Sequence, residues 1–267
     1  MRLSLIVSTY NNPAPLDAIF ARLAGDGTAR PDEVIVADDG SGPATRAVVE
    51  KWMKEGPLTV KHAWHEDKGF RKTRILNAAV AVATGDYVVF LDGDCLPARR
   101  FTQDHLALAE RGTFVQGRRA FVDETKVADL LAGRTTLPHL ALTGKLHGML
   151  KGIRWPVPVI RRNQAQRGLI GCNLGIWRDD LVAVNGFDEA FEGWGIGEDS
   201  DLGTRLYHLG RQRKFVYGRA LVFHLNHPQL NKDHVPDSLR RLQETILTKK
   251  VRCENGLNLH LSSVKKT

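Results

Sequence analysis

The sequence has few cysteines and no long apolar run, and each shortage excludes a class of protein. Its 267 residues include three scattered cysteines, too few for a disulfide framework or a cysteine-rich zinc site. No stretch approaches the roughly 18 apolar residues of a membrane-spanning helix. The apolar run after Met1 is too short for a signal peptide. We therefore expect a globular protein in a reducing, cytoplasmic environment.

Several nucleotide-binding signatures are also missing. No G-x-G-x-x-G follows the first apolar run, which argues against an NAD-linked Rossmann enzyme. Residues 9–13 lack the glycine-rich basic loop expected of a sugar nucleotidyltransferase, the main alternative enzyme class. A basic nucleic-acid-binding module is the other alternative, but aromatic residues are only 7% and the basic residues are dispersed. We expect no nucleic-acid partner. The net charge of +8 then indicates phosphate-bearing substrates or an anionic membrane surface.

Strand and helix patterns alternate through the first hundred residues. We predict strands at 3–8, 33–37, 58–62 and 87–91 and helices at 13–23, 44–54 and 73–83. This alternation predicts an α/β fold with a mainly parallel sheet flanked by helices. Polar groups follow three strands, at residues 8–9, 38–39 and 92–94. Ligands of open sheets bind beyond the carboxyl ends of strands, so we expect these groups to meet in one crevice.

The rest of the chain is less regular. Residues 130–168 contain several glycines and prolines, and we predict an irregular excursion over the active face with one short helix. A helix at 200–209, strands at 215–217 and 220–224, and a basic amphipathic helix at 236–252 follow. No internal repeat or long linker is present, so we expect a single domain.

Asp92, Gly93 and Asp94 follow a predicted buried strand. The glycine lets the chain turn tightly, so that either carboxylate can approach a divalent cation bound to a diphosphate. Asp-Gly is also a common turn dipeptide, but the other acidic strand ends favour a metal site. Asp38 and Asp39 form the second acidic strand end. One can cap the next helix while the other binds a base or ribose.

A third cluster is basic. Arg71 and Arg74 are three residues apart and share a helical face near a predicted N-terminus. Together with Lys68 and Asn77 they could bind a diphosphate there, since a helix N-terminus with cationic neighbours attracts anions. The alternative is a solvated basic patch.

Four segments occur in an order that resembles a known family. Residues 8–11, 38–41, 68–77 and 90–94 are similar to the nucleotide-sugar half of the family 2 inverting glycosyltransferases, which have the GT-A fold. The resemblance covers about the first 110 residues. It implies that Thr9 and Asp39 contact the nucleoside, with Asn11 nearby. It also implies that Asp92 lies near the donor ribose or sugar and that Asp94 ligates Mn²⁺ or Mg²⁺.

The second half resembles the acceptor half of the galactosyltransferase and chondroitin-polymerase branch. Gly193, Trp194 and Gly195 precede an acidic pair there. Glycines let the loop approach a sugar, and Trp194 offers an apolar face to a pyranose ring. Inverting transfer needs one general base. We assign Asp199 that role, with Glu198 as the main alternative, although acidic residues also suit the first turn of any helix.

The resemblance also places a histidine from a late strand on the donor metal. We favour His224 as this ligand, joining Asp94 and Asp92, and His227 could face the phosphate instead. The expected activity is metal-dependent inverting transfer from a nucleotide sugar, by resemblance a UDP-sugar, to a saccharide or lipid-linked saccharide. The expected setting is the synthesis of bacterial cell-surface polysaccharide or lipopolysaccharide.

The predicted domain spans residues 1–267 and divides into three parts. Residues 1–118 form the nucleotide-sugar half, 119–230 the acceptor and catalytic half, and 231–267 a basic helical tail. The tail suggests peripheral association with the inner face of the cell membrane. A solvated helix face explains the same charges equally well.

Overall fold

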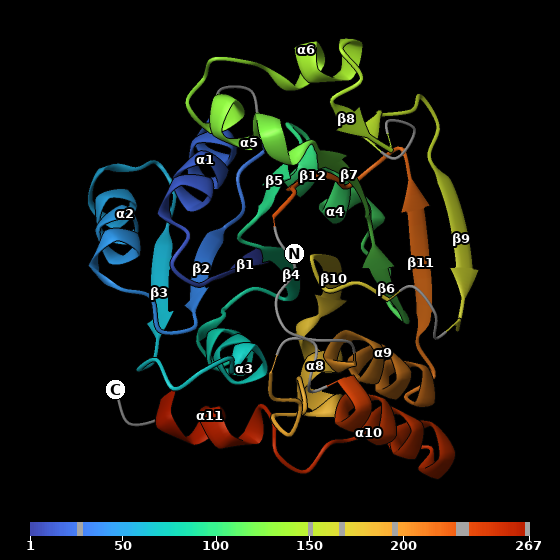
Figure 1. Ribbon diagram of the computed structural model, residues 1–267. Helices are drawn as coiled ribbons and strands as arrows, with labels where there is room; N and C mark the ends of the chain where they lie inside the picture. The colour runs from blue at the N-terminus through green and yellow to red at the C-terminus, as the bar shows by residue number, and fades with distance from the viewer. Residues whose placement is uncertain (26–28, 149–151, 166–168, 194–196, 228–234, 265–267) are drawn as a thin grey trace.

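A mixed sheet of eight strands organises the chain (Figure 1). The computed structural model describes residues 1–25, 29–148, 152–165, 169–193, 197–227 and 235–264. The strand order is β3-β2-β1-β4-β10-β6-β11-β9. These strands are β1 (Leu3–Thr9), β2 (Glu33–Asp38), β3 (Val60–Trp64), β4 (Tyr87–Asp92), β6 (Thr113–Gln116), β9 (Val159–Asn163), β10 (Asn173–Trp177) and β11 (Gln212–Tyr217). Strands β1, β2, β3 and β4 are parallel to one another, and β10 runs antiparallel between β4 and β6.

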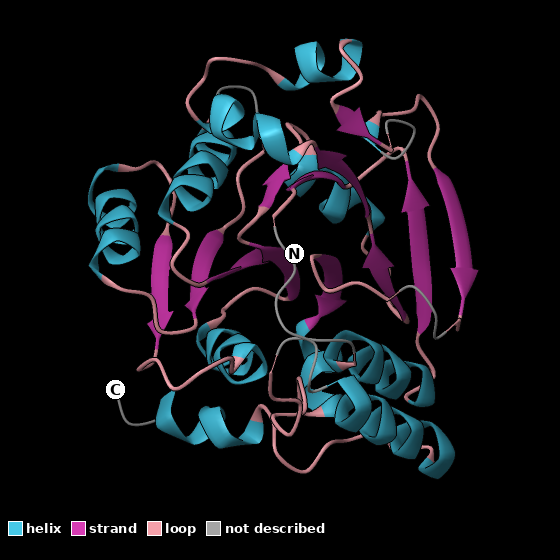
Figure 2. Cartoon of the chain, in the orientation of Figure 1, coloured by secondary structure: helices cyan, strands magenta, loops and turns pink. Residues whose placement is uncertain are grey.

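Helices cover both faces of the sheet, as Figure 2 shows. The helices are α1 (Pro13–Ala24), α2 (Pro43–Glu55), α3 (Lys72–Val82), α4 (Phe101–Leu108), α5 (Glu124–Leu131), α6 (Leu137–Leu142), α8 (Arg178–Val184), α9 (Glu198–His208), α10 (Val235–Thr248) and α11 (Asn258–Val264). Apolar residues of α1 and α2 pack on one face of β1 and β2, in a core that includes Leu5, Phe20 and Val49. Residues of α3, α8 and α9 pack on the other face, around Ile6 and Ile75. The α/β class predicted from the sequence is confirmed.

A second, four-stranded sheet brings distant parts of the chain to the end of β4. Its strand order is β5-β12-β7-β8. The strands are β5 (Cys95–Pro97), β7 (Arg118–Val122), β8 (Leu146–His147) and β12 (Leu221–Leu225). The register places His224 of β12 opposite Cys95 on one side and Phe121 on the other. A late histidine is thereby brought next to the residue that follows Asp94.

The structure differs from the sequence expectations in the second half. Residues 130–168 are more ordered than expected, since α6, β8 and β9 lie within them. Helix α9 begins at Glu198, two residues earlier than predicted, so both acidic candidates lie in its first turn. The predicted tail helix at 236–252 is too long, because α10 ends at Thr248 and Lys249 adopts a positive φ of 52°.

The C-terminal segment packs onto the body of the protein. Cys253 and Leu257 are buried, and Leu257 belongs to the core beneath α3 and α8. Leu239 and Leu247 of α10 remain exposed beside basic residues. Among the described helices, none has both the length and the apolar character needed to cross a membrane.

Candidate active site

The carboxyl ends of β1, β2 and β4 form the floor of the site. The register pairs Ser8 with Asp92 and Thr9 with Asp38. The Ser8 hydroxyl donates to Asp92 Oδ1 at 3.0 Å. A Cβ on Gly93 would lie 2.4 Å from the Ser8 carbonyl oxygen, so only glycine lets this turn lie against β1. The expected convergence of these strand ends is therefore observed.

Asp94, His224 and His227 form a compact group of potential metal ligands. Their ligand atoms all lie within 4.8 Å of one another. Asp94 Oδ2 is 3.4 Å from His224 Nε2 and 3.1 Å from His227 Nε2. Sequence reasoning left the two histidines as alternatives, and the fold brings both to Asp94. One oxygen and two imidazole nitrogens suit Mn²⁺ better than Mg²⁺, which prefers oxygen ligands.

Asp94 has the charge that a metal ligand needs. Burial by itself raises the pKa of Asp94. The hydrogen bond from His227 and the charge of His224 outweigh burial and lower this pKa to about 2. Asp94 is therefore an anion at neutral pH.

Asp92, the further metal ligand expected from the sequence, is not among these three residues, and its role at the metal stays a prediction. Its Oδ1 accepts hydrogen bonds from Lys72 Nζ at 2.6 Å and from the Ser8 hydroxyl. Burial opposes the charge of Lys72, but the carboxylates of Asp92, Asp199 and Glu198 raise the pKa of Lys72 above its usual range. Lys72 is thus a cation that pairs with Asp92 and lies near two further acidic side chains.

Lys72 was missed by the sequence analysis, although a signal for it exists. On α3, Lys72 precedes Ile75, Leu76 and Ala79 by three, four and seven residues. These positions share one helical face, and all three apolar residues are buried. A lysine on the buried face of a helix needs an anionic partner, and Asp92 at the strand end was available.

Glu198 and Asp199 lie in the first turn of α9, both half-buried. The Gly171 N–H donates to Asp199 Oδ2 at 2.7 Å, and a Cβ on Gly171 would lie 2.2 Å from Asp199 Oδ1. Glycine at 171 therefore fixes the Asp199 carboxylate. Burial is the main reason that the pKa of Asp199 is raised. Burial and the charge of Asp199 raise the pKa of Glu198 to about 8.

A fully buried ion pair anchors α9 one turn further along. Arg205 donates to Asp201 at 2.7 Å and to the carbonyl oxygens of Val184 and Gly186. Asp201 also accepts a hydrogen bond from the Thr245 hydroxyl on α10. These contacts bind α9 to two neighbouring segments, so the acidic first turn projects from a rigid support.

On the nucleoside side, Asp39 joins two loops. Its Oδ1 lies 2.6 Å from His65 Nε2, and its Oδ2 accepts the Arg71 N–H at 2.9 Å. Within the described part of the chain, the buried Thr9 hydroxyl has no hydrogen-bond partner. An unmatched hydroxyl at this position is suited to a ligand.

Asp38 and Asn11 shape the loops around this side of the site. Asp38 is fully buried, accepts the Ser41 N–H and contacts His62, so it fixes the turn before α2, whose N-cap is Gly42 and has no side-chain cap hydrogen bond. The Asn11 N–H donates to the Ser41 hydroxyl, and Asn11 Oδ1 accepts the Gly42 N–H. Asn11 thus holds the loop after β2 against the loop after β1, and Asp38 ties the loop after β2 to β3.

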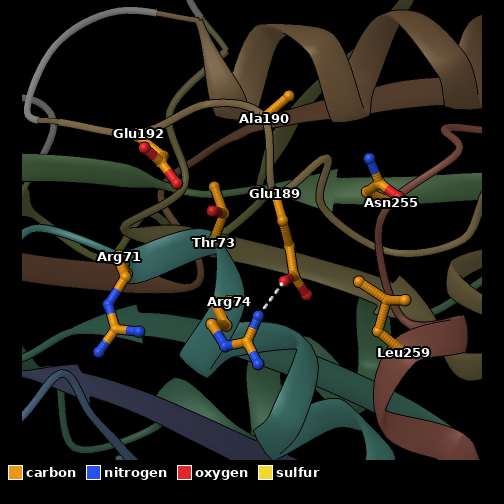
Figure 3. A pocket seen from close by; sticks show the side chains of 8 residues that line it. All are labelled: Arg71, Thr73, Arg74, Glu189, Ala190, Glu192, Asn255 and Leu259. Atoms are coloured by element: carbon orange, nitrogen blue, oxygen red, sulfur yellow. Dashed lines mark hydrogen bonds and ion pairs between the residues drawn. The ribbon is translucent and has the colours of Figure 1, made fainter. Parts of the chain in front are cut away.

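Most of the basic cluster predicted from the sequence, namely Lys68, Arg71 and Arg74, has partners other than the metal-ligand group. Arg71 and Arg74 line an outer pocket of about 400 Å³, where Arg74 pairs with Glu189 at 3.2 Å (Figure 3). Lys68 is exposed and pairs with Glu66. Lys72 points toward the site instead. It lies two residues before Arg74, which corresponds to a rotation of about 200° around the axis of the helix.

Asn77, which was expected to bind the donor, has hydrogen-bond partners within the protein. It is fully buried, and its amide exchanges two hydrogen bonds with the peptide groups of Phe187 at 2.8 and 2.9 Å. It also donates to Glu189. Asn77 therefore fixes the segment that leads to Gly193.

We expect Asn77→Ala to destabilise the protein by about 2–4 kcal/mol, because it leaves two buried peptide groups without partners. Chemical denaturation measures this loss. The affinity of the folded variant for UDP should match that of the wild type. A large loss of UDP affinity with full stability would return Asn77 to the donor site.

Part of the predicted acceptor loop lies outside the described residues, namely Trp194 and Gly195. Gly193 is described, and its N–H donates to the Phe70 carbonyl oxygen at 3.3 Å. Gly193 has a φ of 81°, in the region that favours glycine. The entry to the loop is thus tied to the residues just before α3.

The fold and this arrangement of carboxylates, histidines and lysine define a glycosyltransferase, and the family comparison agrees. Residues 4–175 match the glycosyl transferase family 2, and the chain belongs to that family. Residues 157–228 match the N-terminal domain of galactosyltransferase. The resemblance seen in the sequence is confirmed in both halves.

Comparison with individual proteins agrees with membership of this family. The chain is 28% identical to chondroitin synthase of Escherichia coli over 85% of its length, and 26% identical to hyaluronan synthase of Pasteurella multocida over 93%. It spans only 35% and 27% of those two proteins. The structure of S. aureus TarS 1–349 in complex with UDP-GlcNAc has a TM-score of 0.65 and 17% identity, covering 98% of this chain and 71% of that one. The fold is GT-A.

Proposed function

We propose that this protein transfers a sugar from a UDP-sugar to a saccharide acceptor with inversion of configuration, and that transfer depends on a divalent metal. One observation carries the proposal. The group of Asp94, His224 and His227 lies close to Lys72, which pairs with Asp92 and lies near Asp199 and Glu198. Metal ligands, a fixed cation and a candidate base are the groups that such a displacement requires.

The donor side uses residues from both sheets. Asp39 and the unmatched hydroxyl of Thr9 would contact the nucleoside. Asp94, His224 and His227 would hold the metal, which acts as a Lewis acid that offsets charge on the departing diphosphate. Lys72 adds a fixed positive charge, and Asp92 orients it through their 2.6 Å contact.

Asp199 is the proposed general base. It takes the proton of the acceptor hydroxyl, which attacks the anomeric carbon from the face opposite the diphosphate. The Gly171 N–H holds one oxygen of Asp199, and the other can accept the proton. Burial raises the pKa of Asp199, which makes the carboxylate a stronger base.

The acceptor is proposed to be a glycan or a lipid-linked saccharide of the bacterial cell surface. The polysaccharide synthases among the relatives support a glycan acceptor. The exposed leucines of α10 lie among basic residues, an arrangement that suits peripheral contact with an anionic membrane.

The proposed function is tested by binding and hydrolysis of a panel of nucleotide sugars, with Mn²⁺ and with EDTA. We expect one UDP-sugar to bind in Mn²⁺, and its affinity to fall by at least about tenfold when the metal is removed. Titration calorimetry measures the binding. If no nucleotide sugar binds under either condition, the proposal is wrong.

A further inference from the structure

Residues 153–160 expose more large apolar side chains than any other segment of similar length in the described part of the chain. Ile153, Val157, Val159 and Ile160 are all exposed, and Val157 has 75% of its surface accessible to solvent. They lie in the loop before β9 and in β9 itself, the outermost strand of the large sheet (Figure 1). Apolar side chains that are exposed as a group, and not singly, mark a contact surface.

The backbone holds this segment in a fixed position. Arg219 donates hydrogen bonds to the carbonyl oxygens of Trp155 and Pro156. Pro156 and Pro158 flank Val157, and a proline ring fixes its own φ and carries no N–H. The chain therefore presents Val157 to solvent on a stiff support. The two prolines also lower the number of N–H groups that would lose water if the segment entered an apolar layer.

The surroundings of these apolar side chains are basic. Residues 130–178 contain no aspartate or glutamate. Arg161 and Arg162 follow the apolar pair of β9, and Arg162 pairs with Glu110 at 2.8 Å. Among the described residues Arg161 forms no ion pair, and its guanidinium lies 6.0 Å from the centre of the Tyr217 ring. An exposed arginine beside exposed apolar side chains complements a surface that is anionic outside and apolar beneath.

The geometry of β9 favours a fluid partner over a folded one. Val159 and Ile160 are neighbours on the strand, so their side chains point to opposite faces of the sheet, and both are exposed. A folded protein that packs on one face would cover only one of them, whereas a lipid layer surrounds an inserted edge on both faces. Within the described chain β9 pairs with β11 alone, so its outer edge is accessible. Arginines at such an edge disfavour the addition of a strand from a second copy.

We propose that residues 153–162 insert into the headgroup region of an anionic lipid bilayer. The apolar side chains reach the boundary of the acyl chains, and Arg161 contacts lipid phosphates. This inference rests on the proposed function for its setting, since a lipid-linked acceptor lies at a membrane. It assigns the main membrane contact to the outer edge of the sheet and not to the exposed leucines of α10.

Flotation compares vesicles of phosphatidylcholine with vesicles that also contain phosphatidylglycerol. The variants of the segment are Val157→Ser, Val157→Trp and Arg161→Gln. Leu247→Ser tests the rival contact through α10, where Leu247 is exposed. Met53→Ser is the matched control, since Met53 is an exposed apolar residue of α2. Thermal melting and UDP binding check that each variant is folded, and light scattering without vesicles measures the oligomeric state.

The wild type should bind the anionic vesicles and not the neutral ones. Val157→Ser should lower the partition coefficient by about tenfold, because it removes one buried apolar side chain. Arg161→Gln should lower it by about fivefold, the effect of one cation near an anionic leaflet. Val157→Trp should raise it, since tryptophan favours the membrane interface. Met53→Ser should leave it unchanged.

Three results would overturn the inference. If Leu247→Ser abolishes binding and Val157→Ser does not, the contact is made by α10. If the wild type is a dimer that Val157→Ser dissociates, the segment is an interface between copies. If the wild type binds UDP but no vesicles, this inference is wrong and the proposed transfer of a sugar is unaffected. A wild type that binds anionic vesicles but no nucleotide sugar contradicts the proposed function and supports the membrane contact.

Discussion

Asp94→Asn should lower sugar transfer by at least about a hundredfold and remove the metal dependence of UDP binding. Asparagine keeps the shape of the side chain but not its charge, and Asp94 supplies the one carboxylate of the ligand group. Loss of residues that merely orient metal ligands costs about tenfold to a hundredfold, so loss of a ligand should cost more. Titration of UDP in Mn²⁺ and in EDTA measures the metal-dependent part of the affinity.

Asp129→Asn is a suitable control, because Asp129 on α5 pairs with Arg134 and has no place in the site. His224→Ala and His227→Ala should each weaken metal-dependent binding. If Asp94→Asn keeps both full transfer and the response to EDTA, the metal does not bind at this group. If only one histidine variant has an effect, the other histidine serves a different contact.

Asp199→Asn should lower kcat by about a hundredfold to ten-thousandfold, the range that a general base contributes, while UDP binds as before. The amide can still accept the Gly171 N–H, so the loop geometry should persist. Asp179→Asn offers a matched control, since Asp179 is an exposed carboxylate in the first turn of another helix, α8. Steady-state kinetics separate kcat from KM, and thermal melting checks the fold.

The pH profile distinguishes Asp199 from Glu198. A general base acts only when deprotonated, so the rate should fall as the pH is lowered through the pKa of the base. The pKa of Glu198 is about 8, partly because Asp199 is charged, and Asp199→Asn should lower it. Glu198 is the base if Glu198→Gln costs more activity than Asp199→Asn and the remaining rate of Asp199→Asn extends to lower pH.

The first hundred residues were predictable because their signals are local. Strands β1, β2 and β4 are apolar runs that end in polar residues, and Gly93 marks the turn that brings Asp92 and Asp94 to the floor of the site. The four segments that resemble the family, in their order along the chain, identified the nucleotide-sugar half. Residues 95–122 carry no comparable signal, since β5, β6 and β7 are only three to five residues long.

The contacts between site residues that sequence reasoning left open depend on long-range packing. His224 and His227 come to Asp94 because β12 pairs with β5. That pairing is not marked by spacing in the chain. The buried hydrogen bonds of Asn77 were not predicted, because an asparagine in a family segment and a buried structural asparagine look alike in sequence. The contacts with Phe187 reveal its position.

Glu189 connects the C-terminal helix to the segment that enters the acceptor loop. It is bonded to Arg74 and Asn77 of α3 and, at 2.6 Å, to His260 of α11. Where the domain is cut or fused therefore matters for function. A shortened chain that ends before His260 would lose the contact between Glu189 and α11 and leave the Glu189 carboxylate with fewer partners. The practical boundary of an active fragment thus lies beyond α11, although every candidate for the chemistry lies before residue 228.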